Sequence, residues 1–478
     1  MAADLVVELR RNGAEPLHQQ LEAAIRSRIR DGRLRAGTSL PSTRTLGGAL
    51  GVSRGVVVEA YQQLAAEGYL SSRSGGYTRV AQDLAVDTAP GPAPALTSAL
   101  APRPPPDPPK LDFKYCQPDV TQFPRAAWLR SLRRAVHEAP DEQLAYPTGH
   151  GAAELRQALA DYLNRARGTS ARAEDVVVCS GFTQGLALVV QVLAGRGATR
   201  VAVEDPSDPE IRQVPVDAGL DVVGVPVDEG GLRVDLLDRI DADALLLTPA
   251  HQCPTGAVLS AEARTGVLDW ARERGALVVE DDYDSEYRYD RPPIGALQGL
   301  APDLVVYAGS ASKTLAPALR LGWLVVPGRL LDAVTDEKDL ADCGTARIEQ
   351  QAFADFLARG ELDRHLRRMR AHYRRRRDLL VEAVADTLPE ATVRGIAAGL
   401  HATVQLPDGY DERAILDQAH RRGIDLTTTH DFWITPGTGP PTLLLGYAQI
   451  PEHAIARGIR ELGDAVRATL VPAATADS

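Results

Sequence analysis

The 478-residue sequence is poor in cysteine, has no long apolar run and contains no lysine in its first 80 residues. Its four cysteines lack the spacing of a zinc site or a disulfide framework, so we expect free thiols in a reducing cytoplasm and no structural metal. No run of about 18 apolar residues occurs, which argues against a membrane span, and the N-terminus lacks a signal-peptide apolar region. The sequence therefore predicts a soluble cytoplasmic protein, and its length predicts two or three domains.

Charge is unevenly distributed along the chain. The whole sequence carries a net charge of −11, yet residues 1–80 contain 11 Arg against 7 Asp and Glu, a net of +4 that leaves −15 for the rest. A small basic region joined to a large acidic body predicts that only the N-terminal part meets phosphate groups.

Residues 81–110 separate these two parts. Nine of the 30 residues are Pro and seven are Ala, a composition that favours extended polyproline geometry over packed structure. We interpret the segment as a linker, for which a spacer with no further role is the simplest alternative.

The region before the linker has a helical pattern. Apolar residues recur every four positions over residues 16–30, and Ser42 is placed to cap a second helix. Gly51-Val52-Ser53 predicts a tight turn before a third helix over residues 54–67, and a hairpin with its turn at residues 74–76 follows. Helix, helix-turn-helix and hairpin in this order predict a winged helix.

Residues 16–80 resemble the GntR family of bacterial regulators, most clearly in the stretch from Leu40 to Leu70. The third helix would then meet the major groove of a double-stranded operator, with arginines on base edges or phosphates and hydroxyls on the backbone. A solvated surface charge is the alternative for each arginine, and a protein-interaction module is the alternative for the domain. The predicted DNA-binding residues are Ser42, Thr43, Arg44, Ser53, Arg54 and, on the wing, Arg73.

From residue 111 onward, apolar runs typical of strands alternate with helical stretches. This pattern predicts a multi-domain α/β protein with a mostly parallel sheet covered on both faces. A long basic helix over residues 362–380 and shorter strands after it predict a smaller α+β domain. The predicted strands are Val176–Cys179, Val201–Val203, Ala244–Leu247, Ala276–Glu280 and Leu304–Ala308.

The segment from Ser310 to Arg320 carries the strongest chemical signal. A lysine that forms a Schiff base needs a phosphate clamp nearby, and Ser310, Ser312 and Arg320 surround Lys313 with hydroxyls and a bidentate cation. An isolated lysine in a loop would otherwise be a surface charge.

Two further segments fit the same site. Asp281 and Tyr283 lie at the end of an apolar strand, and strand alternation puts both side chains on the same side. There a carboxylate can face a pyridine nitrogen, and a phenol can bond the ring oxygen O3′. The run Gly181-Phe182-Thr183 follows another strand and opens a helix, whose N-terminal amides can receive a phosphate. We therefore predict a pyridoxal 5′-phosphate (PLP) site.

Residues 111–465 resemble fold-type-I aminotransferases, and their fusion to a GntR head resembles the MocR subfamily. Matching motifs include Tyr146-Pro-Thr-Gly149, His251-Gln-Cys-Pro254-Thr-Gly256 and Glu280-Asp-Asp-Tyr-Asp284. The resemblance implies a winged helix at 1–80, a linker at 81–110, a large PLP domain at 111–326 and a small domain at 327–478.

The resemblance also implies residue roles. Lys313 would form the internal aldimine with PLP, with Asp281 on the pyridine nitrogen, Tyr283 on O3′ and Arg320 on the phosphate. Tyr146 would reach the phosphate of a partner subunit, because sites of this family form at a dimer interface, and the family typically pairs head to tail with its DNA-binding heads exchanged.

Three features depart from the aminotransferase pattern. Asp208 replaces the aromatic residue that normally stacks on the cofactor, and Cys253 replaces an Asn that normally faces O3′. The arginine that holds a substrate α-carboxylate is missing, because no Lys or Arg occurs from Gly423 to Ala456. We therefore predict a transcription regulator that senses PLP or a PLP–amine adduct, with vitamin B6 or amine and amino-acid metabolism as its target. The alternative is a working aminotransferase whose head serves autoregulation.

Overall fold

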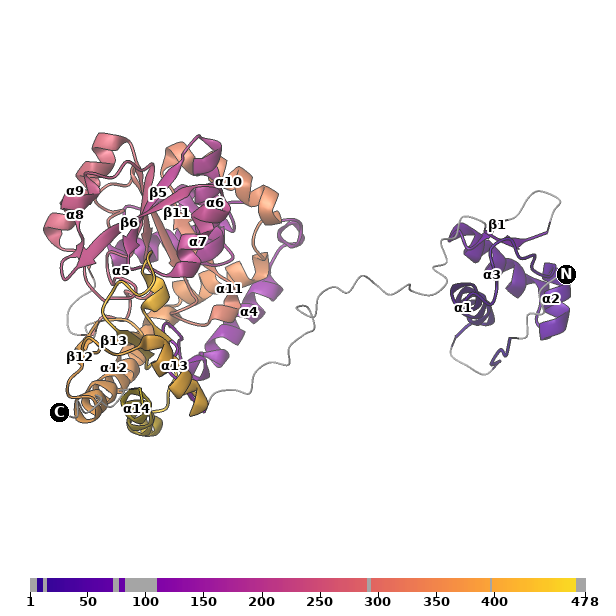
Figure 1. Ribbon diagram of the computed structural model, residues 1–478. Coiled ribbons are helices and arrows are strands. Elements are labelled where there is room, and N and C mark those ends of the chain that lie inside the picture. Colours follow the sequence, from indigo (N-terminus) through magenta and orange to yellow (C-terminus); the bar gives the residue numbers. More distant parts are fainter. Residues whose placement is uncertain are drawn as a thin grey trace. The chain divides into compact units, whose positions relative to one another are not determined.

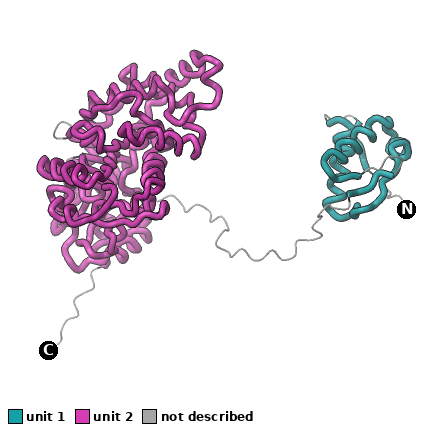
Figure 2. The backbone as a smooth tube through the Cα atoms, turned by 90° about the horizontal axis from the view of Figure 1, so that it is seen from above, with its two compact units in different colours: residues 1–106 teal, residues 107–478 magenta. Residues whose placement is uncertain are grey.

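The computed structural model describes residues 7–11, 15–71, 77–81, 110–289, 294–395 and 398–469. The chain forms two compact units, residues 1–106 and residues 107–478, which Figure 2 shows in two colours. Each unit has its own hydrophobic core, so each is described by itself.

In its described residues, the N-terminal unit has three helices and a two-stranded antiparallel sheet. The first helix buries Leu21, Ile25 and Ile29 against the third helix, as its four-residue apolar repeat predicts. The predicted wing turn and Arg73 lie outside the described residues. The elements are α1 (Leu17–Arg30), α2 (Thr43–Leu50), α3 (Arg54–Ala66), β1 (Leu70–Ser71) and β2 (Arg79–Val80).

Three small residues set the ends of α2 and the start of α3. Ser42 and Ser53 cap the two helices, their hydroxyls accepting hydrogen bonds from the amides of Thr45 and Val56. Gly51 ends α2 with a φ of 64°, a left-handed conformation that glycine adopts at little cost. The Gly51 conformation and the Ser53 cap thus determine where α2 ends and where α3 begins.

The C-terminal unit is built on an eight-stranded sheet in the order β4-β11-β10-β9-β8-β5-β6-β7, shown in Figure 1. Strands β10, β9, β8, β5 and β6 run parallel to one another, whereas β11 is antiparallel to β10 and β4, and β7 is antiparallel to β6. The predicted mostly parallel sheet is confirmed. The bounds are β4 (Val176–Cys179), β5 (Arg200–Asp205), β6 (Asp221–Asp228), β7 (Gly231–Leu232), β8 (Ala244–Leu247), β9 (Leu277–Asp281), β10 (Val305–Ser310) and β11 (Gly322–Val325).

Helices cover both faces of this sheet, because its strands are apolar on both sides. In β4, Val177 and Cys179 belong to the core beneath α6, whereas Val176 and Val178 belong to the core that includes α5 and α11. The covering helices are α4 (Arg125–Glu138), α5 (Ala153–Arg167), α6 (Phe182–Gly195), α7 (Pro209–Asp217), α8 (Val234–Leu237), α9 (Ala261–Arg274), α10 (Gly328–Asp342) and α11 (Arg347–Ala358).

A second, antiparallel sheet of order β12-β13-β16-β15 lies beyond the long helix α12, and β3 pairs separately with β14. Helix α10 packs on α6, and α11 packs on α4 and α5. The chain after residue 327 therefore first adds two helices to the layers around the large sheet, and only after α12 does it form the strands of the small sheet. The remaining bounds are β3 (Leu111–Asp112), α12 (Glu361–Thr387), β12 (Thr392–Arg394), β13 (His401–Gln405), α13 (Glu412–Arg421), β14 (Ile424–Asp425), β15 (Thr427–Thr428), β16 (Thr442–Gly446) and α14 (Glu452–Arg467).

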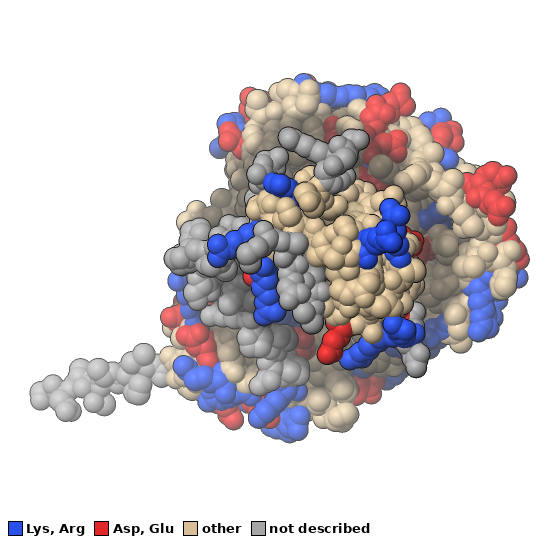
Figure 3. Space-filling view, turned by 90° about the vertical axis from the view of Figure 1, so that its right-hand side faces the viewer, with Lys and Arg blue, Asp and Glu red and all other residues tan. Residues whose placement is uncertain are grey.

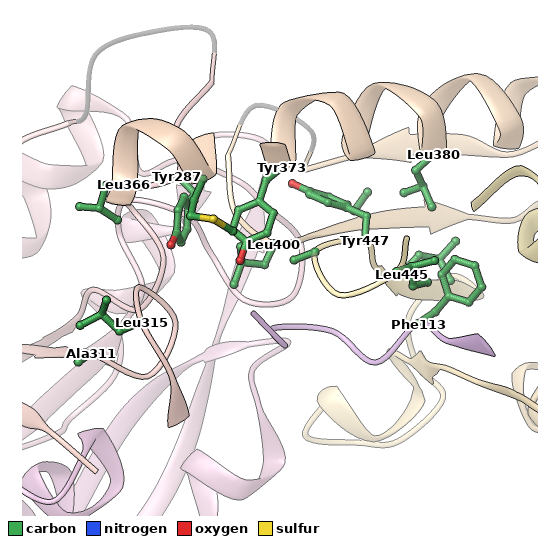
Figure 4. Close-up of a cluster of buried hydrophobic side chains, with 14 of the residues drawn as sticks. Phe113, Tyr287, Ala311, Leu315, Leu366, Tyr373, Leu380, Leu400, Leu445 and Tyr447 are labelled. Atoms are coloured by element: carbon green, nitrogen blue, oxygen red, sulfur yellow. The ribbon is translucent and has the colours of Figure 1, made fainter. Parts of the chain in front are cut away.

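The core beneath α12 joins the two sheets. In Figure 4, Leu366, Tyr373 and Leu380 descend from α12 toward Tyr447 and toward the segment that carries Leu315. This continuous packing ties the loop after β10 to the small sheet.

The surface carries mixed charge. Figure 3 shows exposed side chains of both signs, basic ones in blue and acidic ones in red. Within the described ranges, no helix has the length and apolar character of a membrane span, and no group of three or more potential ligand side chains is arranged to hold a metal ion.

Candidate functional site

A cavity of about 750 Å³ lies at one edge of the large sheet. Strands β4, β5, β8, β9 and β10 all point their carboxyl ends toward this edge, because β4 and β10 both pair antiparallel with β11 between them. The loops that follow these strands therefore converge, which is the position where ligands bind in sheets of this kind. Residues far apart in the sequence, such as Thr183 and Lys313, line the same space.

One end of the cavity is suited to an anion. Cys179, Gly322 and Ser310 are aligned across β4, β11 and β10, which places Gly181 beside Arg320. The Arg320 guanidinium donates a 2.6 Å hydrogen bond to the carbonyl oxygen of Ser180, and a Cβ on Gly181 would lie only 3.0 Å from its Nη2.

Gly181 also opens helix α6 without a side-chain cap. The first amides of α6 have no intrahelical acceptor, so they and the helix dipole face the space next to Arg320. The N-terminus of α6, the Arg320 cation and the hydroxyls of Ser310 and Ser312 thus lie at one end of the cavity, a set of groups that suits an anion such as phosphate; we refer to it as the phosphate cradle.

A carboxyl group stands on another wall of the cavity. Burial raises the pKa of Asp281 well above its usual value, with Asp282 and Asp284 adding to the effect and Lys313 opposing it. A cationic partner such as a protonated ring nitrogen would favour the charged form again. Beneath it, Asp282 accepts hydrogen bonds of 2.6 Å from Arg167 and from the Tyr307 hydroxyl, which fixes the end of β9.

Tyr283 belongs to a buried polar chain. Its hydroxyl lies 3.1 Å from Nδ1 of His251, and the same nitrogen lies 2.9 Å from the Asp284 carboxylate. The carboxylate accepts the Nδ1–H, so the phenol keeps its own hydrogen for another acceptor. The arrangement can thus donate a hydrogen bond into the cavity.

Lys313 is held by its neighbours in the sequence. Ala311 and Leu315 are buried in the core drawn in Figure 4, while Lys313 lines the same cavity as Arg320 and Asp281. The amine is thereby anchored on a rigid segment and remains open to a small molecule.

The structure brings most of the predicted cofactor residues together. Gly181 borders the cavity through Arg320, whereas Tyr146 is 93% exposed and does not line it. The predicted residues that line the cavity are Phe182, Thr183, Cys253, Asp281, Tyr283, Ser310, Ser312, Lys313 and Arg320.

Asp208 has a role that the sequence did not reveal. One carboxylate oxygen accepts a 2.6 Å hydrogen bond from the Tyr115 hydroxyl, and the other accepts the Glu210 amide at the start of α7. Tyr115 itself lines the cavity, with its ring 5.5 Å from that of Phe432. An aromatic wall is thus present, although it comes from a different part of the chain.

The other cations that line the cavity are engaged within the protein. Lys114 forms a 2.9 Å ion pair with Asp425. Arg212 donates to the carbonyl oxygens of Ser207, Asp431 and Phe432. Among the described lining residues, Lys114 is thus paired with a carboxylate and Arg212 with three carbonyl oxygens, whereas Arg320 has one such bond, to Ser180, and Lys313 forms no ion pair.

Sequence reasoning also missed Cys116 and His401, which come from the segment after β3 and from β13. The Cys116 thiol lines the cavity, and its Sγ lies 3.6 Å from Nδ1 of His401. Neither residue lies in a recognisable motif, so only folding reveals their proximity.

In the N-terminal unit, Arg44 and Arg54 are exposed near the first turns of α2 and α3. Neither forms an ion pair with the residues that the structure describes, and Arg54 makes a 3.4 Å hydrogen bond to Thr43. Arg26, by contrast, is bound to Glu67 at 2.7 Å. The N-terminal ends of α2 and α3 thus present two cations and the Ser42 and Ser53 hydroxyls to solvent.

These two units define a class of protein, a helix-turn-helix regulator fused to a PLP-type transferase fold. Residues 17–80 match the bacterial regulatory proteins of the gntR family, and residues 112–452 match aminotransferase class I and II, a PLP-dependent family. The chain belongs to the aminotransferase class I and II family and carries a gntR-family head, which is the MocR-type architecture that the sequence predicts.

Relatives with the same organisation span the whole chain. It is 34% identical over 467 residues to the HTH-type pyridoxine biosynthesis transcriptional regulator PdxR of Corynebacterium glutamicum, covering 98% of this chain and 99% of that protein. It is 32% identical over 473 residues to the probable rhizopine catabolism regulatory protein MocR of Rhizobium meliloti, covering 96% and 95%.

The transferase unit also resembles solved enzymes. The α-aminoadipate aminotransferase LysN of Thermus thermophilus, complexed with N-(5′-phosphopyridoxyl)-L-leucine, superposes with a TM-score of 0.69 at 28% identity, over 75% of this chain and 92% of that one.

Proposed function

We propose that the chain is a DNA-binding transcription regulator that holds PLP on Lys313 and alters its binding to an operator when an effector occupies the cavity. The observation that carries the proposal is the convergence of a lysine, a buried carboxyl group and an anion cradle on one cavity, in a chain that also has a gntR-family head. Such a regulator acts on chromosomal DNA, and its expected location is the cytoplasm.

The lining residues fit the cofactor by charge and position. PLP supplies an electrophilic aldehyde that captures primary amines. Arg320, the Ser310 and Ser312 hydroxyls and the α6 amides at Gly181, Phe182 and Thr183 would hold its phosphate. Asp281 would keep the ring nitrogen protonated, and Tyr283 would donate a hydrogen bond to O3′. Cys253 would stand near O3′, at the position where aminotransferases have an Asn.

The effector is PLP itself, or an amine that lacks an ordinary α-carboxylate. Lys114 and Arg212 are already bound by Asp425 and by backbone carbonyl oxygens, so neither is free to clamp a carboxylate. The pyridoxine biosynthesis regulator among the relatives supports PLP as effector and vitamin B6 supply as target, whereas the rhizopine catabolism regulator supports an amine-metabolism target.

Regulation requires that the ligand favour one arrangement of the DNA-binding heads over another, because a ligand shifts an equilibrium only by its differential affinity. We propose a head-to-tail homodimer with exchanged heads, in which the exposed Tyr146 completes the phosphate cradle of the partner. A mixture of Lys313→Ala and Tyr146→Ala chains tests this. It would restore PLP binding at one site per mixed dimer if Tyr146 acts in trans, and would restore none if Tyr146 acts within its own chain.

A gel-shift titration on the DNA upstream of the protein's own gene, with and without PLP, tests the function. We expect PLP to change the affinity of the wild-type protein and to have no effect on Lys313→Ala. Arg54→Ala should weaken operator binding by about 1–3 kcal/mol while PLP binding persists. Arg457→Ala, an exposed change on α14, is the matched control. Equal operator affinity for Arg54→Ala and wild type would refute the assigned contact.

The second candidate function is catalytic transamination. The likeness to solved aminotransferases favours it, while the engaged cations in the cavity oppose it. Steady-state turnover with a panel of amino donors and 2-oxo acids separates the two, since efficient multiple turnover would rule out a pure sensor.

A further inference from the structure

Two cysteines lie in the wall of the cavity. Cys116 and Cys253 come from the segment after β3 and from the loop after β8, yet both line the cavity, and Tyr115, the neighbour of Cys116 in the chain, packs against the cluster that contains Cys253. Cys179 lies in the sheet core and Cys343 is exposed, and neither lines the cavity. The protein thus contains one thiol pair and two thiols that serve as internal comparisons.

The two thiols differ in acidity. The hydrogen bond from Cys253 is the largest cause that lowers the pKa of Cys116 to about 5; burial opposes this, and the charge of His401 and its hydrogen bond, 3.6 Å away, add to it. The same contact and burial raise the pKa of Cys253 well above its usual value. The Cys116 thiol therefore loses its proton more readily than the Cys253 thiol does.

The pair adjoins the groups that would bind the cofactor ring. Cys253 packs with Phe432 and Leu444, and the rings of Tyr115 and Tyr283 pack against this cluster. A small oxidant can reach both sulfurs through the cavity, although the surrounding side chains bury each cysteine from bulk solvent.

We propose that Cys116 and Cys253 form a dithiol that a hydroperoxide closes to a disulfide, so that the pocket senses oxidants as well as its effector. In the first step the Cys116 thiolate attacks the peroxide O–O bond, the sulfur is oxidised to a sulfenic acid, and the departing oxygen takes a proton from His401 or water. In the second step the Cys253 sulfur attacks the sulfenic sulfur, the S–S bond forms, and hydroxide leaves with the Cys253 proton as water.

This chemistry goes beyond the proposed function and does not depend on it. A disulfide between Cys253 and Cys116 would displace the Cys253 sulfur from its position against Tyr283. The cavity wall next to the cofactor ring would change shape as a result. Bound PLP fills the same cavity, so it should slow the oxidation.

The test treats the full-length protein, free of PLP, with hydrogen peroxide, blocks remaining thiols with iodoacetamide under denaturing conditions and maps the peptides by mass. We expect a linked peptide containing Cys116 and Cys253, whereas Cys179 and Cys343 remain alkylated. Absence of that linked peptide, or equal oxidation of Cys179, would overturn the proposal. The mass readout needs no bound cofactor, so it distinguishes failure here from failure of the proposed function.

Two variants assign the roles. In Cys253→Ser we expect dimedone to trap a sulfenic acid on Cys116, and in Cys116→Ser we expect no trapped sulfur at Cys253. The rate of trapping should change little between about pH 6 and pH 8, whereas N-acetylcysteine, with an ordinary pKa of about 8.5, should react roughly 50- to 100-fold faster at the higher pH. Trapping at Cys253 in Cys116→Ser would contradict the assignment.

Discussion

Replacing Gly181 by alanine tests the phosphate cradle directly. Gly181 adopts φ 96° and ψ 174°, a region essentially reserved for glycine, so an alanine there costs about 1–3 kcal/mol of strain. Its Cβ would also lie 3.0 Å from Nη2 and 3.2 Å from Nη1 of Arg320 and would push the guanidinium aside. A hydrogen bond to a charged group contributes about 1.5–3 kcal/mol, and each 1.4 kcal/mol is about a tenfold change in affinity. We expect PLP to bind Gly181→Ala roughly ten- to a hundredfold more weakly.

The assay is a PLP titration followed by visible absorbance, with urea unfolding of the same protein. Gly195→Ala is the matched control, because Gly195 lies in the same helix α6 and a Cβ there meets nothing within 4 Å. The control should bind PLP as the wild type does and be equally or more stable. Wild-type PLP affinity in Gly181→Ala would refute the placement of the phosphate.

Two further predictions concern stability. Asp282→Ala leaves the Arg167 guanidinium buried without its carboxylate, so urea unfolding should show a loss of about 3–5 kcal/mol; a loss below about 1 kcal/mol would contradict the importance of the pair. Burial raises the pKa of Glu204 to about 7, so between about pH 4.5 and pH 7 the folded state holds a proton that the unfolded state has released. This contribution to stability falls as the pH rises through that window. Glu204→Gln, which keeps an acceptor for Thr248, should flatten the decline, and an unchanged pH profile would count against it.

The sequence predicted those features that short-range patterns encode. The Ser42 and Ser53 caps and the apolar repeat of α1 are local signals, and the structure contains the helices they predict. The strand positions and the mostly parallel sheet were likewise predictable from continuous apolar runs separated by helices. Because parallel strands bring their carboxyl ends to one edge, the convergence of Asp281 and Lys313 also followed from their positions after strands.

Contacts between distant segments were not predictable in this way. Tyr115 and Asp208 are 93 residues apart, and Cys116 and His401 are 285 residues apart, yet the side chains of each pair are in contact. Their partners are set by how the segment after β3 and the small sheet pack against the large sheet. The engagement of Arg212 by backbone carbonyl oxygens similarly depends on a loop more than 200 residues away.

The most direct test of the account is the site of cofactor attachment. The protein contains four lysines, Lys110, Lys114, Lys313 and Lys338, so borohydride reduction after incubation with PLP followed by peptide mass analysis identifies the attachment site uniquely. The account predicts one pyridoxyl group per chain on the peptide containing Lys313, and its loss in Lys313→Ala. A protein that stays colourless and gains no mass, or a label shared among the other three lysines, would contradict it.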